Sequence, residues 1–407
     1  MKSLLNLSVR TKLALVTIFV PLASLGIVGS ASAATQTWSG NGADGNWSTV
    51  GNWVSGVAPV NGDDVVIDNS AKFTNGSKDD IALLTSINSL KFINNSSSGG
   101  PVVSFGHNIT ITAGITQDAT VTNTANAIQD NGSSVVITLG ANAIITSGGG
   151  GLTLGTIGQS DSLVMGNNLT FTDNGGTTAN ITAIYIPISG NGTVTFNGGS
   201  TDYQLHGANT YSGTTIVQAT NLPIAADGTA ANDAFGTSAI TIGNGGAIDF
   251  QYNGNATINN AITITGTANG SPVTSLGFGS TANPTTLTVP KITLNGSTRI
   301  ANDNSSGQLT VNLAGITSNG YCIEYLGGSS YSDGPGNGFT NGPAGCIVSG
   351  TLASTTGGTA TPAPKTPNTG FGLISTNVWL PLAGAIMVGS GLYIFSRKFS
   401  SRSTINK

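Results

Sequence analysis

The feature that most constrains the fold of this chain is a series of short runs in which apolar residues alternate with Thr or Ser. A period of two places successive side chains on opposite faces of a β-strand. Each run ends in Asn, Gly or Asp, which favour turns. The runs cover residues 65–67, 89–92, 109–112, 135–138, 169–172, 194–196, 239–242, 262–265 and 309–311.

The number of these runs exceeds what one β-sandwich needs, and no helical period of comparable length interrupts them. Many short strands with repeated turn signals are typical of a β-solenoid, in which each coil stacks on the next. We expect coils of about 20 to 25 residues with their Thr face outward. Two or three β-sandwich domains in tandem are the alternative.

Composition excludes other fold classes. Glu324 is the only Glu, and charged residues make up 7% of the 407, which is unlike a helix bundle or coiled coil. The 59 Gly follow no three-residue period and Pro numbers only 14, which excludes collagen. The low charge is also unlike a disordered chain. An all-β protein remains.

Residues 1–34 are predicted to be a secretory signal peptide. A basic start precedes an apolar stretch over residues 13–28, and a pattern of small residues ends at Ala33. We expect cleavage after Ala33 or Ala34. The alternative is an N-terminal membrane anchor that is retained.

The other end of the chain has the composition of a membrane anchor. Residues 371–396 contain no charge, and the most apolar part, 378–395, would span roughly 27 Å as a helix. We predict a transmembrane helix here. The basic residues in 397–407 predict a tail that stays in the cytoplasm.

A short motif precedes this segment. Thr366, Pro367, Asn368, Thr369 and Gly370 resemble the sorting signal of sortase-anchored surface proteins, with Thr366 where that family has Leu. The resemblance implies that a sortase-type transpeptidase cuts between Thr369 and Gly370 and joins Thr369 to an amine of the cell envelope. An anchor that no enzyme cuts is the alternative.

The exported part, residues 35–369, carries 6 Lys and Arg against 17 Asp and Glu. This acidic balance argues against nucleic acid and against docking on anionic lipid. Residues 350–367 are rich in Thr, Gly, Ala and Pro and are predicted to be a stalk. We place the solenoid ectodomain at 60–349.

Within the solenoid, residues 205–217 resemble the autotransporter-associated β-strand repeat. The matching positions are Gly207, Asn209, Thr210, Tyr211, Gly213 and Thr215. The resemblance implies a right-handed parallel β-helix. We expect Gly207 and Gly213 to permit tight turns, Asn209 to stack on Asn of neighbouring coils, and Tyr211 to pack at the edge of a coil.

Three of the four Trp, Trp38, Trp47 and Trp53, lie near the start of the exported part. The first coil of a solenoid has open strand edges, and bulky aromatic residues can cover them. We therefore interpret residues 35–68 as an aromatic N-terminal cap. A sugar-binding platform is the alternative.

Candidate chemistry is sparse. Cys322 and Cys346 are both exported, which favours a disulfide. His107 and His206 are far apart in the sequence, and we interpret both as ordinary surface or turn residues. The paired carboxylates Asp63-Asp64 and Asp79-Asp80 should point to opposite faces of their strands.

Residues 39–44 resemble one calcium-binding nonapeptide, which works only in tandem. We therefore interpret this segment as a turn, and we predict no metal, no cofactor and no catalytic residue.

The sequence thus predicts a bacterial protein that is exported and displayed at the cell surface, anchored to the cell wall or cytoplasmic membrane. Its role is predicted to be structural or adhesive, with a glycan or another cell surface as a possible ligand. The competing class is a carbohydrate-active enzyme, a polysaccharide lyase or glycosidase, on the same fold. A groove holding two Asp and a basic residue would favour the enzyme.

Overall fold

The structure is a computed structural model that describes one compact unit of the chain, with gaps, between residues 33 and 349. The predicted signal and transmembrane helices lie outside the described residues. The described residues are 33–71, 76–96, 100–122, 124–156, 160–174, 180–198, 201–218, 224–228, 234–243, 246–252, 255–265, 274–279, 285–289, 291–302, 309–313, 315–317, 319, 321, 323–327, 331–332 and 347–349.

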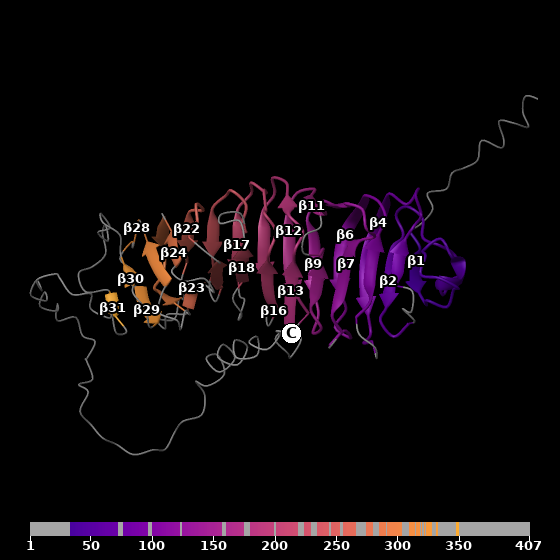
Figure 1. The fold of residues 1–407 in the computed structure, drawn as a ribbon, viewed down its shortest axis with the longest axis horizontal. Coiled ribbons are helices and arrows are strands. Elements are labelled where there is room, and N and C mark those ends of the chain that lie inside the picture. The colour runs from indigo at the N-terminus through magenta and orange to yellow at the C-terminus, as the bar shows by residue number, and fades with distance from the viewer. Residues whose placement is uncertain are drawn as a thin grey trace, which may run out of the picture. The chain divides into compact units, whose positions relative to one another are not determined.

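The described residues form three β-sheets, and every strand pair within them is parallel (Figure 1). The main path of the first sheet consists of β1 (Thr35–Trp38), β2 (Asp64–Asp68), β4 (Ser86–Ile93), β6 (Ile109–Gln117), β9 (Ala143–Ser147), β12 (Leu169–Asp173), β15 (Val194–Asn197), β17 (Thr215–Gln218), β19 (Ile240–Ile242), β22 (Ile262–Ile264), β25 (Ile292–Leu294) and β28 (Ile316–Thr317). Three further strands join it beside β6: β8 (Val136–Leu139), β11 (Ser162–Met165) and β14 (Ile188–Ser189).

The second sheet consists of β3 (Ser77–Asp79), β5 (Val102–Phe105), β7 (Asn126–Asp130), β10 (Leu152–Leu154), β13 (Asn180–Ile184), β16 (Thr201–Leu205), β18 (Ile224–Gly228), β20 (Ile248–Tyr252), β23 (Thr274–Gly279), β26 (Thr298–Asn302), β29 (Ile323–Gly327) and β31 (Ile347–Ser349). The third consists of β21 (Ala256–Thr257), β24 (Thr285–Val289), β27 (Leu309–Leu313) and β30 (Tyr331–Ser332). Because the chain visits the sheets in turn and pairs in parallel with its own preceding coil, it is a parallel β-solenoid. The predicted all-β parallel solenoid is confirmed, and the alternative of tandem antiparallel sandwiches is wrong.

The alternating sequence pattern directs one side chain of each strand into the coil. In β22 the two Ile are buried while Thr263 between them is partly exposed. The register of the first sheet joins one buried apolar residue of each coil to the next. That row is Val65, Leu90, Ile115, Ile145, Phe171, Phe196, Val217, Ile242, Ile264 and Leu294. The core is therefore one column of apolar side chains that runs from coil to coil.

Aromatic residues stack between coils both in this row and in the second sheet. The rings of Phe171 and Phe196 are stacked with centroids 5.0 Å apart, and those of Phe250 and Phe278 are 5.7 Å apart. Such pairs contribute about 0.5 to 1.5 kcal/mol beyond their buried area. The stacked coils thus gain attraction between identical positions as well as hydrogen bonds between their backbones.

Coil length varies more than the sequence indicated. Phe196 pairs with Val217, 21 positions on, whereas Ile115 pairs with Ile145, 30 positions on. The expectation of about 20 to 25 residues is therefore too narrow. The coil from Ile115 to Ile145 holds an extra strand, β8. Strand β6 pairs with β8 through its first half and with β9 through its second half. Gly114 stands between the halves with a φ of 120°, and a Cβ there would lie 2.1 Å from the Ile144 carbonyl oxygen.

The described residues contain one short 3₁₀ helix, η1 (Val50–Asn52), and no α-helix. It lies in the segment between β1 and β2, which folds over the first coil. The single antiparallel contact recorded in the described part of the chain, a bridge from Trp38 to Trp53, belongs to the same segment.

Candidate functional site

The three Trp of the N-terminal segment form one buried cluster. Trp38 and Trp53 meet edge to face with ring centroids 5.2 Å apart, and Trp47 and Trp53 do so at 5.5 Å. The indole N–H of Trp47 donates to Ser77 Oγ at 2.8 Å. All three indoles are at most 3% exposed. Their faces are therefore unavailable to a sugar, and the alternative of a sugar-binding platform is not supported by this geometry.

The same segment covers the free edges of both main sheets. The Trp47 N–H donates to the Lys78 carbonyl and the Lys78 N–H donates to the Gly45 carbonyl, each at 2.8 Å, so this stretch pairs with β3. The Val54 N–H donates to the Thr37 carbonyl at 2.9 Å on β1. Because β1 and β3 begin the two sheets, the segment protects the edges that another chain could otherwise extend. This supports the interpretation of a cap.

The predicted turn at residues 39–44 is part of this cap. Asp44 accepts hydrogen bonds from the backbone and side chain of Asn46, and these bonds lower the pKa of its carboxyl group. Asn52 accepts the Gly42 N–H at 2.7 Å. Within the described ranges, no group of three His, Cys, Asp or Glu side chains is placed to hold a metal ion.

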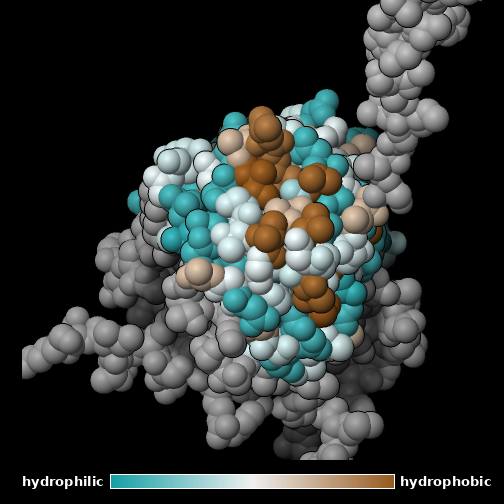
Figure 2. Space-filling view, turned by 90° about the vertical axis from the view of Figure 1, so that its right-hand side faces the viewer, coloured by the Kyte–Doolittle hydropathy of each residue, from teal (hydrophilic) through white to brown (hydrophobic). Residues whose placement is uncertain are grey.

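The outer surface of the cap is partly apolar. Figure 2 faces this end and shows brown patches among teal ones. The exposed apolar side chains here are Val50, Val54, Val57, Val60 and Leu83, with Leu83 85% exposed. White and teal surface interrupts the brown patches in Figure 2.

The repeat-like segment forms the corner between β16 and β17. Asn209 is buried, and its side chain joins three coils: Oδ1 accepts the Ile188 N–H and Nδ2 donates to the Ala234 carbonyl, each at 2.7 Å. The expected stacking of Asn209 on another Asn is wrong, because its partners are backbone groups. Such an Asn contact occurs elsewhere, between Asn168 Nδ2 and Asn142 Oδ1 at 2.9 Å.

The other residues of this segment close the corner. Tyr211 is fully buried rather than at the coil edge, and its hydroxyl lies 2.7 Å from Thr215 Oγ1. Burial raises the pKa of the Tyr211 hydroxyl far above its usual value. A Cβ at Gly213 would lie 1.9 Å from a backbone oxygen of the preceding coil, and one at Gly207 would lie 2.8 Å from another. Thr210 is exposed and donates its N–H to the Ile188 carbonyl at 2.8 Å.

The outward face of the first sheet carries a row of six Thr residues that one Ile interrupts. The register joins residues of successive coils, all half-buried, along β12, β15, β17, β19, β22, β25 and β28. They are Thr170, Thr195, Ile216, Thr241, Thr263, Thr293 and Thr317. Because neighbouring strands lie about 4.8 Å apart, the row presents hydroxyls at about this spacing except at Ile216, and it carries no charge. The alternating pattern indicated outward Thr, but only the register shows that they are aligned.

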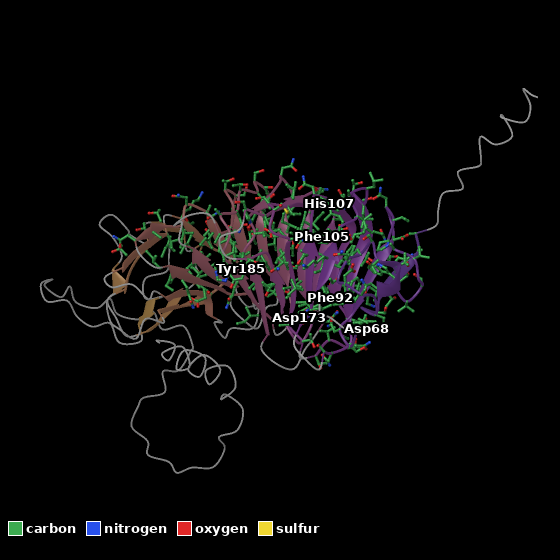
Figure 3. All side chains as sticks on the ribbon, turned by 45° about the vertical axis from the view of Figure 1, so that its right-hand side comes forward. Asp68, Phe92, Phe105, His107, Asp173 and Tyr185 are labelled. Carbon is green, nitrogen blue, oxygen red and sulfur yellow. The ribbon has the colours of Figure 1, made fainter. Side chains whose placement is uncertain are left out.

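The two His occupy different environments; Figure 3 labels His107 and, further along the solenoid, Tyr185, the residue on which His206 stacks. His107 Nε2 lies 2.7 Å from the Leu84 carbonyl and 3.3 Å from the Asp79 carboxylate. Asp79 is fully buried, and burial raises the pKa of its carboxyl group to about 6. The ring of His206 stacks on that of Tyr185 with centroids 4.4 Å apart.

Carboxylates are also buried inside the coils. Asp63 and Asp79 point inward and their neighbours Asp64 and Asp80 point outward, as the alternation predicts. Asp161, 2% exposed, accepts the Val135 N–H at 2.9 Å; burial, and to a lesser extent nearby Asp130, raises the pKa of its carboxyl group. Asp63, Asp79 and Asp161 face the core, where a polysaccharide chain has no access. Sequence reasoning missed Asp161, because an isolated Asp in a turn does not show that it is buried.

Several predicted features lie outside the described residues. They are the disulfide between Cys322 and Cys346, the stalk at 350–367, the sorting signal at 366–370, the transmembrane segment at 371–396 and the tail at 397–407. Among the residues that are described, no helix is long and apolar enough to cross a membrane.

No protein-family model, no curated protein and no solved structure matches this chain.

Proposed function

We propose that this chain is an exported bacterial surface protein whose parallel solenoid is anchored to the envelope and has a structural or adhesive role. The observation that carries the proposal is the uncharged row from Thr170 to Thr317 along the first sheet. Its hydroxyls repeat from coil to coil, except at Ile216, and offer several weak contacts of one kind to an extended partner such as a glycan or another cell surface. Many equal contacts along one line favour avidity over a single tight site.

The hand of the coil is part of the proposal. Connections between parallel strands of one sheet are right-handed in nearly all proteins, because a right-twisted strand packs back onto its sheet in only that way. The resemblance of residues 205–217 to the autotransporter-associated repeat also implies a right-handed helix. We therefore propose a right-handed β-helix.

The mode of anchoring to the envelope is proposed from three features in order: the motif at 366–370, the uncharged segment at 371–396 and the basic tail at 397–407. The apolar segment holds the chain in the membrane during export, and the basic residues stop it with the tail inside. A sortase-type thiol then attacks the Thr369 carbonyl, and an envelope amine takes over the acyl group.

Mass spectrometry of C-terminal peptides from envelope fractions tests this mode of anchoring. In the natural sequence we expect the exported chain to end at Thr369. Thr369→Ala should leave the chain membrane-embedded and uncut, whereas the control Asn368→Ala should be processed normally. Peptides that run intact across Thr369–Gly370 in most molecules would contradict sortase cleavage and leave the membrane segment as the anchor.

Binding of the exported protein to a panel of glycans and intact cells tests the adhesive role. Replacing Thr195, Thr241 and Thr263 with Asp places three charges in the row, and we expect binding to a recognised surface to fall at least tenfold. The control is Thr153→Asp on β10, in the second sheet. Equal losses from both variants, or none from the row, would argue against the row as the contact surface.

A further inference from the structure

The described chain becomes anchored to the solenoid at Ala34. The Ala34 N–H donates to Asp63 Oδ1 at 2.9 Å, and the Ala34 carbonyl accepts the Asp64 N–H at 2.8 Å. One residue later, Thr35 begins β1 in register with Asp64. Ala33 and Ala34 are both exposed. Any cut that preserves the two hydrogen bonds of Ala34 therefore falls before Ala34.

Asp63 is a buried carboxylate whose hydrogen-bond donors are neutral. Its side chain accepts N–H groups from Ala34, from the Gln36 amide at 3.4 Å and from the Val60 backbone at 3.0 Å. Asp63 is 2% exposed. Within the described part of the chain, the ion pairs are Lys91 with Asp118 and His107 with Asp79, so no side-chain cation is paired with Asp63. A buried carboxylate without a cation carries a desolvation cost that an adjacent positive charge offsets.

The sequence allows signal cleavage after Ala33 or after Ala34, and the two cuts have different consequences at Asp63. A cut after Ala34 removes both hydrogen bonds that Ala34 makes and leaves Asp63 Oδ1 without that donor. A cut after Ala33 retains both bonds and turns the Ala34 nitrogen into an α-ammonium group beside the carboxylate. Charge-assisted hydrogen bonds of this kind are roughly twice as strong as neutral ones.

We propose that export produces a mature chain that begins at Ala34, and that the new α-ammonium group of Ala34 forms an ion pair with the buried carboxylate of Asp63. A signal peptidase adds water across the Ala33–Ala34 peptide bond, so that Ala33 leaves as a carboxylate and Ala34 becomes an ammonium group. Processing thereby supplies the cation that Asp63 lacks and fixes the start of β1. This inference rests on the proposed function only in requiring export.

Other charges near this pair have their own partners. Asp64, next in the chain, accepts hydrogen bonds from Asn88 at 2.8 Å and Ser89 at 2.5 Å. On β4, Lys91 is paired with Asp118 at 2.7 Å. Asp68, at the far end of β2, accepts hydrogen bonds from Ser70 and Asn94. Asp63 is thus the carboxylate that the new terminus contacts.

The test uses the full chain, exported by its own signal and purified from the envelope. Mass spectrometry after amine labelling identifies the first residue, which we expect to be Ala34. A chain that is found only inside the cell would show that export itself fails, which is a failure of the proposed function. An exported chain that begins at Met1, at Thr35 or at any other residue than Ala34 would overturn this inference alone.

The second readout is the rate at which the α-amine reacts with an acylating reagent as pH varies. An unpaired α-amine has a pKa of about 7.7 to 8.0. We expect the folded protein to react about tenfold more slowly at pH 7 than the urea-unfolded protein, which corresponds to a rise of about one unit. Asp63→Asn should remove this protection, and the matched control Asp68→Asn, at the far end of the following strand β2, should keep it. If Asp63→Asn does not fold, the pH profile of the natural sequence decides: a midpoint at the ordinary value overturns the ion pair.

Discussion

The indole of Trp53 lies edge-on to that of Trp47, and its N–H donates to the Trp47 backbone carbonyl at 2.7 Å. Trp47 in turn packs edge to face against Phe105 of β5, with centroids 5.9 Å apart. One aromatic side chain therefore joins the cap to the first coils of the solenoid. The stability of the cap and the protection of the sheet edges depend on the same contact.

Trp47→Ala should destabilise the protein by about 3 to 5 kcal/mol, because it removes a fully buried indole and leaves a cavity. It should also favour self-association, since the edges of β1 and β3 become accessible. Urea denaturation and sedimentation velocity measure the two effects. The control Val54→Ala, in the same cap but 71% exposed, should change stability by less than about 0.5 kcal/mol. A monomeric Trp47→Ala protein of natural stability would contradict the role of the cap.

Asn209→Ala should cost about 2 to 4 kcal/mol. The substitution leaves the Ile188 N–H and the Ala234 carbonyl without their partner inside the corner, and each buried unpaired group costs about 1 to 3 kcal/mol. The neighbouring control Thr210→Ala changes an exposed side chain and should be nearly neutral. Denaturation midpoints compare the two. Equal effects would show that Asn209 does not hold the coils together.

The buried carboxyl group of Asp79 makes stability depend on pH. Its pKa of about 6 lies above the ordinary value of 3.8, so the folded protein binds this proton more tightly than the unfolded chain does. The free energy of unfolding should therefore fall as pH rises from about 4 to about 6, by on the order of 2 kcal/mol.

Asp79→Asn should remove most of that slope, as measured by urea denaturation across this pH range. Asp161, whose pKa burial also raises, accounts for part of the slope that remains. Asp118→Asn is the control, because the contribution of Asp118 to the free energy of unfolding changes with pH in the opposite direction. A hydrogen bond from Lys91 lowers the pKa of Asp118, so its small contribution is lost as pH falls. An unchanged slope in Asp79→Asn would show that Asp79 does not titrate in this range.

The disulfide between Cys322 and Cys346 stays a prediction from the sequence, because both residues lie outside the described ones. We expect the exported protein to be two hydrogens lighter than its reduced form. Reduction should lower stability by about 3 kcal/mol for a loop of this length. Alkylation of both thiols in unreduced protein would refute the bond.

The inward and outward residues of most strands could be predicted from the sequence because alternation is a local property. Ile262 and Ile264 are buried and Thr263 is not, as their order indicates. Parallel stacking followed from the number of runs and the lack of helices between them. These two inferences are sufficient to predict the solenoid.

The features that the sequence could not predict depend on the register between coils. The extra strand β8 lengthens one coil because β6 divides at Gly114, and nothing in the local pattern marks that division. Asn209 reaches backbone groups about 20 residues away on both sides, which a motif alone does not reveal. The burial of Asp63 likewise depends on β1 pairing with β2.

Labelling of lysine side chains on intact cells tests the central claim, display of the solenoid outside the cell, most directly. Lys78 and Lys291 are exposed at opposite ends of the described solenoid and suit an amine reagent that does not cross membranes. In cells that express the full chain, we predict that both lysines are labelled to nearly the extent found after lysis. Labelling of Lys78 and Lys291 that appears only after the cells are lysed would contradict display at the surface.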